Sequence, residues 1–282
     1  MNTAIQPGYK QTEVGVIPED WHTVPLGQVV TFQRGYDLPH RLRKNGDVPL
    51  VSSAGVTDRH CTAMAQPPGV VTGRYGTIGE IFFINEPFWP LNTTLYVRDF
   101  HGNDERFIYY LLKPFDFASF SGKSGVPGVN RNDLHAEMVS LPINITEQTA
   151  IASALSDMDA LLDGLDRLIT KKRNLKQAAM QQLLTGKTRL AGFEGEWEVR
   201  RLGDLLTICH GKSQKDVETI DGAYPILATG GQIGTASRAL YDQPSVLIGR
   251  KGTINQPQYM DTPFWTVDTL FYSILKNNRH YL

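Results

Sequence analysis

Three glycines lie beside an arginine and a tyrosine in the segment VVTGRYGTIGE, residues 70–80, and a segment of this kind can hold a phosphate group. A dinucleotide-binding loop, however, has the spacing GxGxxG and leads directly into a helix. Here Gly73, Gly76 and Gly79 are evenly spaced, and the following IGEIFFI has the composition of a strand. The sequence therefore predicts a tight turn between two strands. Arg74 lies at its tip, where it either contacts a backbone phosphate or remains a solvated side chain.

The chain lacks the motifs of common catalytic sites. Three GK[S/T] triplets begin at Gly122, Gly186 and Gly211. A P-loop needs another glycine five residues before such a triplet. The residues at those positions are Phe117, Gln181 and Leu206. No HExxH, GxSxG or CxxC motif and no Asp/Asn-Pro-Pro-aromatic tetrad of a methyltransferase is present, so we expect a chain that is not an enzyme by itself and has no catalytic residue.

The composition is that of an ordinary globular protein. Hydrophobic residues make up 41% of the 282 residues, which suffices for one large or two modest domains. No apolar run reaches the length of a membrane span, and the N-terminus has no apolar signal region, so we expect a cytoplasmic protein with no membrane partner. The net charge of −1 argues against a protein that coats nucleic acid nonspecifically. It is compatible with a chain that concentrates its cationic side chains on one face.

The two cysteines and seven histidines form no metal-binding pattern. Cys61 and Cys209 stand far apart and lack metal-ligand spacing, which fits a reducing compartment. We expect both to be buried small side chains, and we expect no bound metal.

The turn segment occurs twice, and this repeat is the main fact of the sequence. From Val246 the chain reads VLIGRKGTINQ, at an offset of 176 residues from the first copy. At the same offset, without any gap, the two copies share turn residues and large aromatic residues. The first-copy members of the matched pairs are Trp21, Leu26, Gly27, Gly35, Pro49, Gly55, Gly73, Arg74, Gly76, Thr77, Ile78, Pro87, Phe88, Trp89, Thr93 and Tyr96. The chain therefore contains two copies of one domain.

The matched residues set the backbone path and the core, whereas the segments between them differ. Residues 36–47 do not resemble residues 212–223, and residues 57–66 do not resemble residues 233–242. A shared scaffold with divergent surface segments suggests two modules that read different things. Both copies have short β-rich runs separated by turn residues, and the first has a helical pattern after them. The predicted fold class is therefore α/β (α+β), with two repeated mixed α/β domains and antiparallel or mixed sheets.

A long helix is predicted between the copies, because residues 146–184 contain no proline and only one glycine, Gly164. Thr146 and Asn144 are alternative N-caps. Apolar residues recur with coiled-coil spacing and shift phase once. The predicted interface residues are Ile151, Leu155, Met158, Leu162, Leu165, Ile169, Leu175 and Leu183. This seam either packs on its own domain or pairs with a partner helix, and the sustained heptads favour the coiled-coil spacer.

Six segments of the sequence are informative in combination. They are KQTEVGVIPEDW (10–21), GRYGTIG (73–79), GVNRNDLHAEMVSLPI (128–143), TEQTAIASALSDMD (146–159), QQLLTGKTRL (181–190) and GFEGEWEVRRLGDL (192–205). Together they resemble the specificity subunit of type I restriction–modification systems. The resemblance covers nearly the whole chain. It implies a first target-recognition domain at residues 1–145, a conserved spacer helix at residues 146–186, and a second, truncated recognition domain at residues 187–282.

The resemblance also implies a sequence-specific DNA-binding subunit with no chemistry of its own. Each recognition domain is expected to read one half of a bipartite double-stranded DNA target, and the helix to dock the methyltransferase subunits. Those subunits use S-adenosylmethionine to methylate adenine, and a restriction subunit uses ATP and magnesium, so no cofactor is expected on this chain. The alternatives are a truncated or regulatory half-subunit and a protein-interaction module without a DNA partner.

The second copy is incomplete in this sequence. At the fixed offset Leu282 corresponds to Arg106, so counterparts of residues 107–184 are not present. We therefore expect a fragment or a truncated product of a longer chain. The seam then has no partner helix within the chain and is expected to self-associate or to pair with a methyltransferase subunit.

Cationic and polar side chains of both copies are the candidate DNA contacts, because affinity for DNA depends on Arg and Lys at phosphates. In the first copy they are Arg34, Arg41, Arg43, Lys44, Arg59, Arg74, Tyr75, Lys123 and Arg131. In the second copy they are Lys212, Lys215, Gln232, Arg238, Arg250 and Lys251. The residues at matched positions, Arg74 and Arg250, should hold the DNA backbone, whereas those in divergent segments should read bases. For each of them, a solvated surface residue is the alternative.

Overall fold

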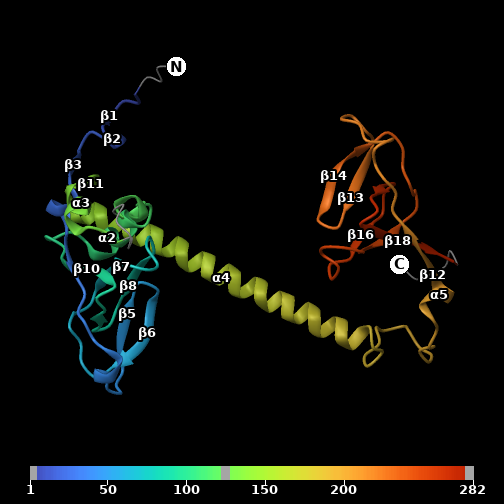
Figure 1. Ribbon diagram of the computed structural model, residues 1–282, viewed down its shortest axis with the longest axis horizontal. Helices are drawn as coiled ribbons and strands as arrows, with labels where there is room; N and C mark the ends of the chain where they lie inside the picture. The colour runs from blue at the N-terminus through green and yellow to red at the C-terminus, as the bar shows by residue number, and fades with distance from the viewer. Residues whose placement is uncertain (1–4, 122–127, 277–282) are drawn as a thin grey trace. The chain divides into compact units, whose positions relative to one another are not determined.

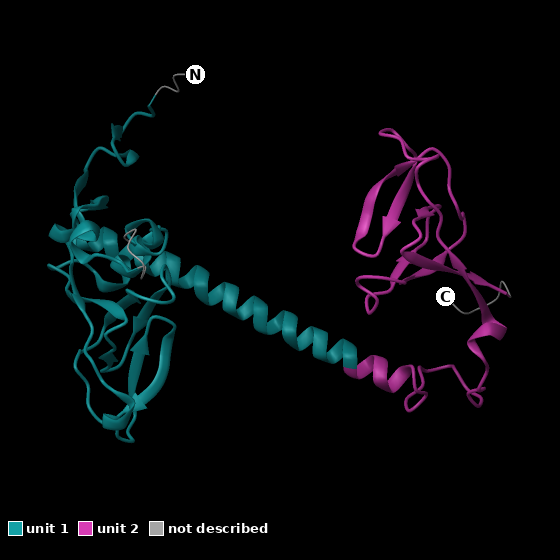
Figure 2. Ribbon diagram, viewed as in Figure 1, with its two compact units in different colours: residues 1–177 teal, residues 178–282 magenta. Residues whose placement is uncertain are grey.

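The computed structural model describes residues 5–121 and 128–276. It divides into two compact units, which Figure 2 colours separately. Unit 1 comprises residues 1–177 and unit 2 comprises residues 178–282. Each unit contains its own clusters of buried hydrophobic side chains and is described by itself.

Two sheets form the centre of unit 1 (Figure 1). Their strands are β4 (Thr31–Arg34), β5 (Val48–Ser52), β6 (Gly55–His60), β7 (Gly69–Gly73), β8 (Ile81–Ile84), β9 (Trp89–Pro90) and β10 (Thr94–Asp99). The larger sheet has the order β4-β10-β7-β8 with antiparallel pairs throughout. The smaller sheet has the order β6-β5-β9, in which β5 and β9 run parallel. The prediction of a mixed α/β domain with antiparallel or mixed sheets is therefore confirmed.

Apart from its long helix, the remaining elements of unit 1 are short. The hairpin β1 (Tyr9–Thr12) and β2 (Gly15–Pro18) comes first, and β3 (Trp21–Pro25) pairs with β11 (Met138–Pro142). The helices are α1 (Leu26–Val29), α2 (Glu105–Leu112) and α3 (Arg131–Ala136), with 3-10 turns η1 (His40–Leu42) and η2 (Phe117–Phe120). Asp104 begins α2 by accepting the Phe107 N–H at 2.8 Å. Phe32, Val70, Ile108 and Leu134 belong to the main buried cluster, so α2 and α3 pack on the larger sheet.

Unit 2 repeats the same strands. They are β12 (Leu206–His210), β13 (Tyr224–Ala228), β14 (Gly231–Ala236), β15 (Ser245–Gly249), β16 (Gln258–Met260), β17 (Trp265–Thr266) and β18 (Leu270–Leu275), preceded by α5 (Leu202–Leu205). The sheet orders are β12-β18-β15-β16 and β14-β13-β17, again with one parallel pair, β13 and β17. The bounds of β13, β14, β15, β17 and β18 equal those of β5, β6, β7, β9 and β10 shifted by the offset of 176. The predicted duplication is confirmed strand by strand.

Gly35 and Gly211 explain why the two copies share particular glycines. A Cβ atom on Gly35 would lie 2.1 Å from the carbonyl oxygen of Leu91, and one on Gly211 would lie 2.0 Å from that of Val267. The offset that relates the glycines also relates Leu91 to Val267. Two backbones are in direct contact at this place in both units, so no residue with a side chain fits.

The long helix α4 (Ile145–Leu183) contains 39 residues. Its cap is Asn144, whose side-chain oxygen accepts the Thr146 N–H at 2.9 Å, so the alternative cap Thr146 is wrong. Asn144 is preferred because its side chain reaches an N–H of the first turn that has no partner within the helix. The first turns dock on unit 1, since Gln148 is buried and hydrogen-bonds the backbone of Asp104 and Pro142. The helix predicted from the sequence is therefore confirmed.

The expectation that both cysteines are buried is wrong. Cys61 is exposed, and Cys209 is partly buried. Cys61 directly follows β6, which is an edge strand of the smaller sheet, so its side chain lies outside the core. Among the described residues, no helix is both long and apolar enough to cross a membrane, and no three His, Cys, Asp or Glu side chains are grouped to hold a metal ion.

Candidate functional site

A cavity of about 340 Å³ in unit 1 brings four of the candidate residues together. Arg34, Arg74, Tyr75 and Arg131 all line it. They come from the end of β4, from the turn after β7 and from the start of α3. None of the described lining residues is acidic, so three guanidinium groups give the cavity a chemistry that favours an anionic group.

The turn that carries Arg74 and Tyr75 joins two antiparallel strands, β7 and β8, as the sequence predicts. The backbone N–H groups of Arg74 and Tyr75 both donate to the carbonyl of Thr93, at 2.8 and 3.1 Å. The Arg74 guanidinium lies over the Tyr75 ring, 4.5 Å from the ring centroid, which is a cation–π distance. The Arg74 carbonyl accepts the N–H of Val129 at 3.0 Å. The backbone of the turn is thus held on both sides, and the two side chains project from a fixed support.

Residues 128–132 form another wall of the cavity. A Cβ atom on Gly128 would lie 2.1 Å from the Tyr75 ring, so only glycine allows this close packing. The side chain of Asn130 accepts the N–H of Asn132 at 2.9 Å and caps α3. This cap makes Arg131 the first residue of the helix.

His135 holds α3 against β4. Its Nε2 accepts the N–H of Phe32 at 2.9 Å, and the two rings stack with centroids 6.0 Å apart. Burial lowers the pKa of His135, and the positive charges of Arg131 and His101 lower it further. Only the neutral imidazole accepts at Nε2 in this arrangement. The position of Arg131 therefore depends on an uncharged His135.

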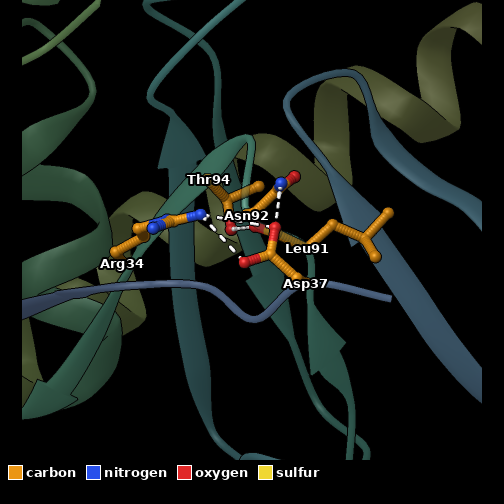
Figure 3. Close-up of polar contacts among 5 residues, drawn as sticks. All are labelled: Arg34, Asp37, Leu91, Asn92 and Thr94. Atoms are coloured by element: carbon orange, nitrogen blue, oxygen red, sulfur yellow. Dashed lines mark hydrogen bonds and ion pairs between the residues drawn. The ribbon is translucent and has the colours of Figure 1, made fainter. Parts of the chain in front are cut away.

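Arg34 differs from the other two arginines because it has a carboxylate partner (Figure 3). Its guanidinium donates to both oxygens of Asp37, at 3.1 and 3.3 Å. The side-chain amide of Asn92 donates to the same carboxylate. Next to it, the hydroxyl of Thr94 donates to the carbonyl of Leu91 at 2.8 Å. Arg34 and Asp37 are 51% and 65% exposed, so the pair contributes little to stability and mainly fixes the direction of both side chains.

Two further cationic candidates of unit 1 form ion pairs away from this cavity. Arg43 donates to Asp58 at 2.9 Å. The hydrogen bond from Arg43, together with one from the backbone of Arg59, lowers the pKa of Asp58. Arg59 itself lies 3.8 Å from Glu86. Their role as DNA contacts stays a prediction, as does that of the exposed Arg41 and Lys44. Lys123 lies outside the described residues.

The candidates of unit 2 lie on several different elements. Gln232 lines a cavity of about 430 Å³ that none of the other five candidates lines. The Lys212 carbonyl accepts the indole N–H of Trp265 at 3.0 Å, and the Arg238 guanidinium lies 6.0 Å from the centroid of the Trp265 ring system. The Arg250 N–H donates to the Thr269 carbonyl at 2.8 Å, which repeats the bond of Arg74 to Thr93. Lys215 and Lys251 are exposed.

Four residues near the site were missed by the sequence analysis, namely Asp37, Asn92, Asn130 and Asn132. The pattern Asn-Arg-Asn-Asp at residues 130–133 resembles the start of a helix and could have placed Asn130 as a cap beside Arg131. No local pattern indicates the other pair. Asp37 and Asn92 are far apart in the sequence and meet only because of the fold.

The apolar seam of α4 is exposed over most of its length. Ile151 packs on the main core of unit 1, so packing on its own domain accounts for the first turns only. The exposed members are Leu155, Met158, Leu162, Leu165, Ile169 and Leu175, whose exposed fractions lie between 41% and 60%. Leu183 is half-buried. An apolar row with heptad spacing and this exposure is suited to contact another helix, and a coiled-coil partner stays a prediction.

The chain thus combines a duplicated α/β fold with a cation-lined cavity in unit 1. The chain belongs to the family of the type I restriction modification DNA specificity domain, whose model matches residues 18–174 and 194–282. This finding confirms the resemblance noted in the sequence.

Two curated relatives come from Methanocaldococcus jannaschii. The chain is 23% identical over 251 residues to the type I restriction enzyme MjaIX specificity subunit and 22% identical over 221 residues to the MjaVIII specificity subunit. These matches cover 73% and 70% of this chain but 56% and 51% of the relatives. The chain therefore spans about half the length of the curated relatives it matches.

The fold is also similar to that of a solved structure, the S subunit of a type I restriction–modification system from M. genitalium. The TM-score is 0.65 at 18% sequence identity, over 93% of this chain and 74% of that chain. At this identity the likeness concerns the fold alone.

Proposed function

We propose that this chain is the sequence-recognition subunit of a type I restriction–modification complex and that each unit reads one half of a bipartite DNA target. The observation that carries the proposal is the convergence of Arg34, Arg74 and Arg131 on one cavity in a member of the DNA specificity domain family. Guanidinium groups are the preferred protein ligands of phosphate, and phosphate contacts supply most of the affinity for DNA. In this role the chain positions other subunits and performs no reaction itself.

The exposed seam of α4 supports the second part of the proposal, the docking of methyltransferase subunits. An amphipathic helix with an apolar row binds a partner by burying that row. The proposed division of the chain is into recognition domains at residues 1–145 and 187–282 and a spacer at residues 146–186. S-adenosylmethionine, ATP and magnesium then belong to the methyltransferase and restriction subunits in the cytoplasm, and this chain binds no cofactor.

The test is the adenine methylation pattern of host DNA when the chain is expressed with its cognate methyltransferase subunit. A split, asymmetric methylated motif is the expected result, because two divergent units then each read one half. A symmetric motif would mean that unit 1 acts as a dimer and that unit 2 is dispensable. A soluble complex that neither methylates DNA nor binds duplex DNA in a salt-dependent way would contradict the proposal.

A further inference from the structure

Arg34 lines the cationic cavity, whereas its ion-pair partner Asp37 lines a second cavity of about 460 Å³. Asn92 and Thr93 also line the second cavity, and Leu38 and Leu91 supply apolar wall. The two cavities thus meet at one ion pair but differ in chemistry. The first offers guanidinium groups to an anion. The second combines hydrogen-bonding groups with apolar surface, which suits the edge of a base.

The arrangement of Asp37 and Asn92 leaves two hydrogen-bond acceptors for a ligand. An ionised carboxylate only accepts, so the Asn92 amide must turn its nitrogen to Asp37, and Figure 3 shows the amide oxygen pointing away from that carboxylate. Oδ1 of Asp37 takes bonds from both Asn92 and Arg34, whereas Oδ2 takes one from Arg34 only. The free sites are therefore on Asp37 Oδ2 and on Asn92 Oδ1. Both attract an N–H donor and repel another acceptor.

Two buried polar atoms of the same cavity have no hydrogen-bond partner in the described part of the chain. They are Nε of Arg43 and Oγ1 of Thr93. Buried polar atoms are rarely left unpaired in folded proteins. Both atoms are closed to solvent, so they add polar character to the wall of the cavity but are not among the groups that a ligand would contact.

The polar groups of this cavity differ between the two copies, although the scaffold is shared. At the offset of 176, Arg34, Asp37 and Asn92 correspond to His210, Ser213 and Asp268. Thr93, in contrast, is matched by Thr269. Divergent side chains on a matched framework are what two modules need if they read different bases.

We propose that Asp37 and Asn92 select a base whose major-groove edge carries an amino group, cytosine or adenine, at one position of the half-target read by unit 1. This inference rests on the proposed DNA recognition. The one amino hydrogen that base pairing leaves free donates to Asp37 Oδ2, whereas guanine O6 and thymine O4 would present acceptors to that atom and to Asn92 Oδ1 and are rejected. Arg34 is a positioning residue, because it holds the Asp37 carboxylate in place from the side of the cationic cavity.

The experiment selects duplexes from a pool with a random window, using the full chain and sequencing the bound fraction. Asp37→Asn replaces an acceptor by a donor without changing shape, so that one position of the selected motif should move from cytosine or adenine toward guanine or thymine by about tenfold. Asp37→Ser introduces the residue that unit 2 carries at the matched position and should relax the same position. The matched control is Asp47→Asn, an exposed acidic residue of the same divergent segment, whose carbonyl and not its carboxylate accepts from Arg59.

The outcomes separate the two proposals. A single altered position with Asp37→Asn, and an unchanged motif with Asp47→Asn, supports the inference. If both Asp37 variants select the wild-type motif, the inference is overturned and the proposed function still stands. The same conclusion follows if Asp47→Asn changes the motif as much as Asp37→Asn does. A wild-type chain that selects no motif would contradict the proposed function itself.

Discussion

Arg74 and Arg131 reach the same cavity without a carboxylate partner among the described residues, whereas Arg34 is tied to Asp37. The difference matters because a guanidinium without an ion-pair partner can exchange its hydration for a phosphate contact. The backbone of Arg74 is fixed by Thr93 and Val129. We therefore expect Arg74 and Arg131 to bind an anion and Arg34 to orient Asp37.

Replacing Arg74 by alanine should weaken binding to all duplexes alike. The loss of one phosphate contact should lower affinity by about tenfold. It should also reduce the slope of log affinity against log salt concentration by about one. Fluorescence anisotropy of labelled duplexes over a salt series measures both. Arg167→Ala, on the exposed surface of α4, is the control and should leave both unchanged. A changed recognition sequence in the Arg74 variant would show that this side chain reads bases instead.

His135 predicts a pH dependence of stability. Burial lowers the pKa of His135 in the folded state, so below about pH 6.5 the unfolded chain binds more protons than the folded chain. The stabilisation from neutral His135 is thus fully present above about pH 6.5 and is lost as the pH falls toward the folded-state value.

Urea unfolding on either side of that pH tests the effect of His135. The wild-type midpoint should fall on acidification, and His135→Gln, which keeps an acceptor but cannot titrate, should reduce the fall. His22→Gln, at an exposed position, is the control. Equal falls in all three proteins would mean that His135 does not govern the acid loss.

At the scale of elements, the two units share one framework of strands and turns, and the segments between these shared elements differ. The contact of Gly35 with Leu91 recurs between Gly211 and Val267, and the parallel strand pair recurs with the same register. The long helix follows a different rule. Its first turns are buried through Gln148 and Ala152, and its later turns carry an apolar row that unit 1 does not cover.

Leu162→Glu tests whether that row binds a partner. Leu162 is 60% exposed, so the substitution should leave thermal unfolding nearly unchanged and should abolish co-purification with the methyltransferase subunit or self-association. Sedimentation and co-purification measure the effect. Ala160→Glu adds the same charge on the opposite face of the helix and should retain binding. Retained binding in both variants would exclude the row as the docking surface.

At the scale of the whole molecule, each unit has its own buried clusters, and related residues build them. Val51, Val71, Phe88 and Tyr96 pack together in unit 1. Their counterparts Leu227, Leu247, Phe264 and Tyr272 pack together in unit 2. Two units with separate cores can evolve different surfaces without disturbing each other, which suits a target with two different halves.

Separate units also predict additive effects on DNA binding. Arg74→Ala and Arg250→Ala should each lower affinity for a complete target by about tenfold, and the double variant by about a hundredfold, because residues without shared partners act independently. Titration of the same duplex with all four proteins measures the coupling. A double variant no weaker than either single variant would mean that both arginines act on one shared contact.

The amino-acid sequence by itself determined the duplication, the strand-to-strand turn, the long helix with its heptads and the family. These features leave local or periodic signals, because a turn needs glycine at particular places and an amphipathic helix needs apolar residues at a fixed period. The sequence left two alternative N-caps for α4, Asn144 and Thr146, and the structure shows that Asn144 is the cap. The exposure of Cys61 was not foreseen, because burial depends on where a strand lies in its sheet.

Only the tertiary structure decided which cations act together. Arg34, Arg74 and Arg131 lie far apart in the chain, and they meet because β4, β10 and β7 are hydrogen-bonded neighbours and because Gly128 packs on Tyr75. The same folding gives Arg43 a carboxylate partner and brings Asn92 to Asp37. Such contacts follow from strand pairing and burial across the whole unit, and no spacing along the chain encodes them.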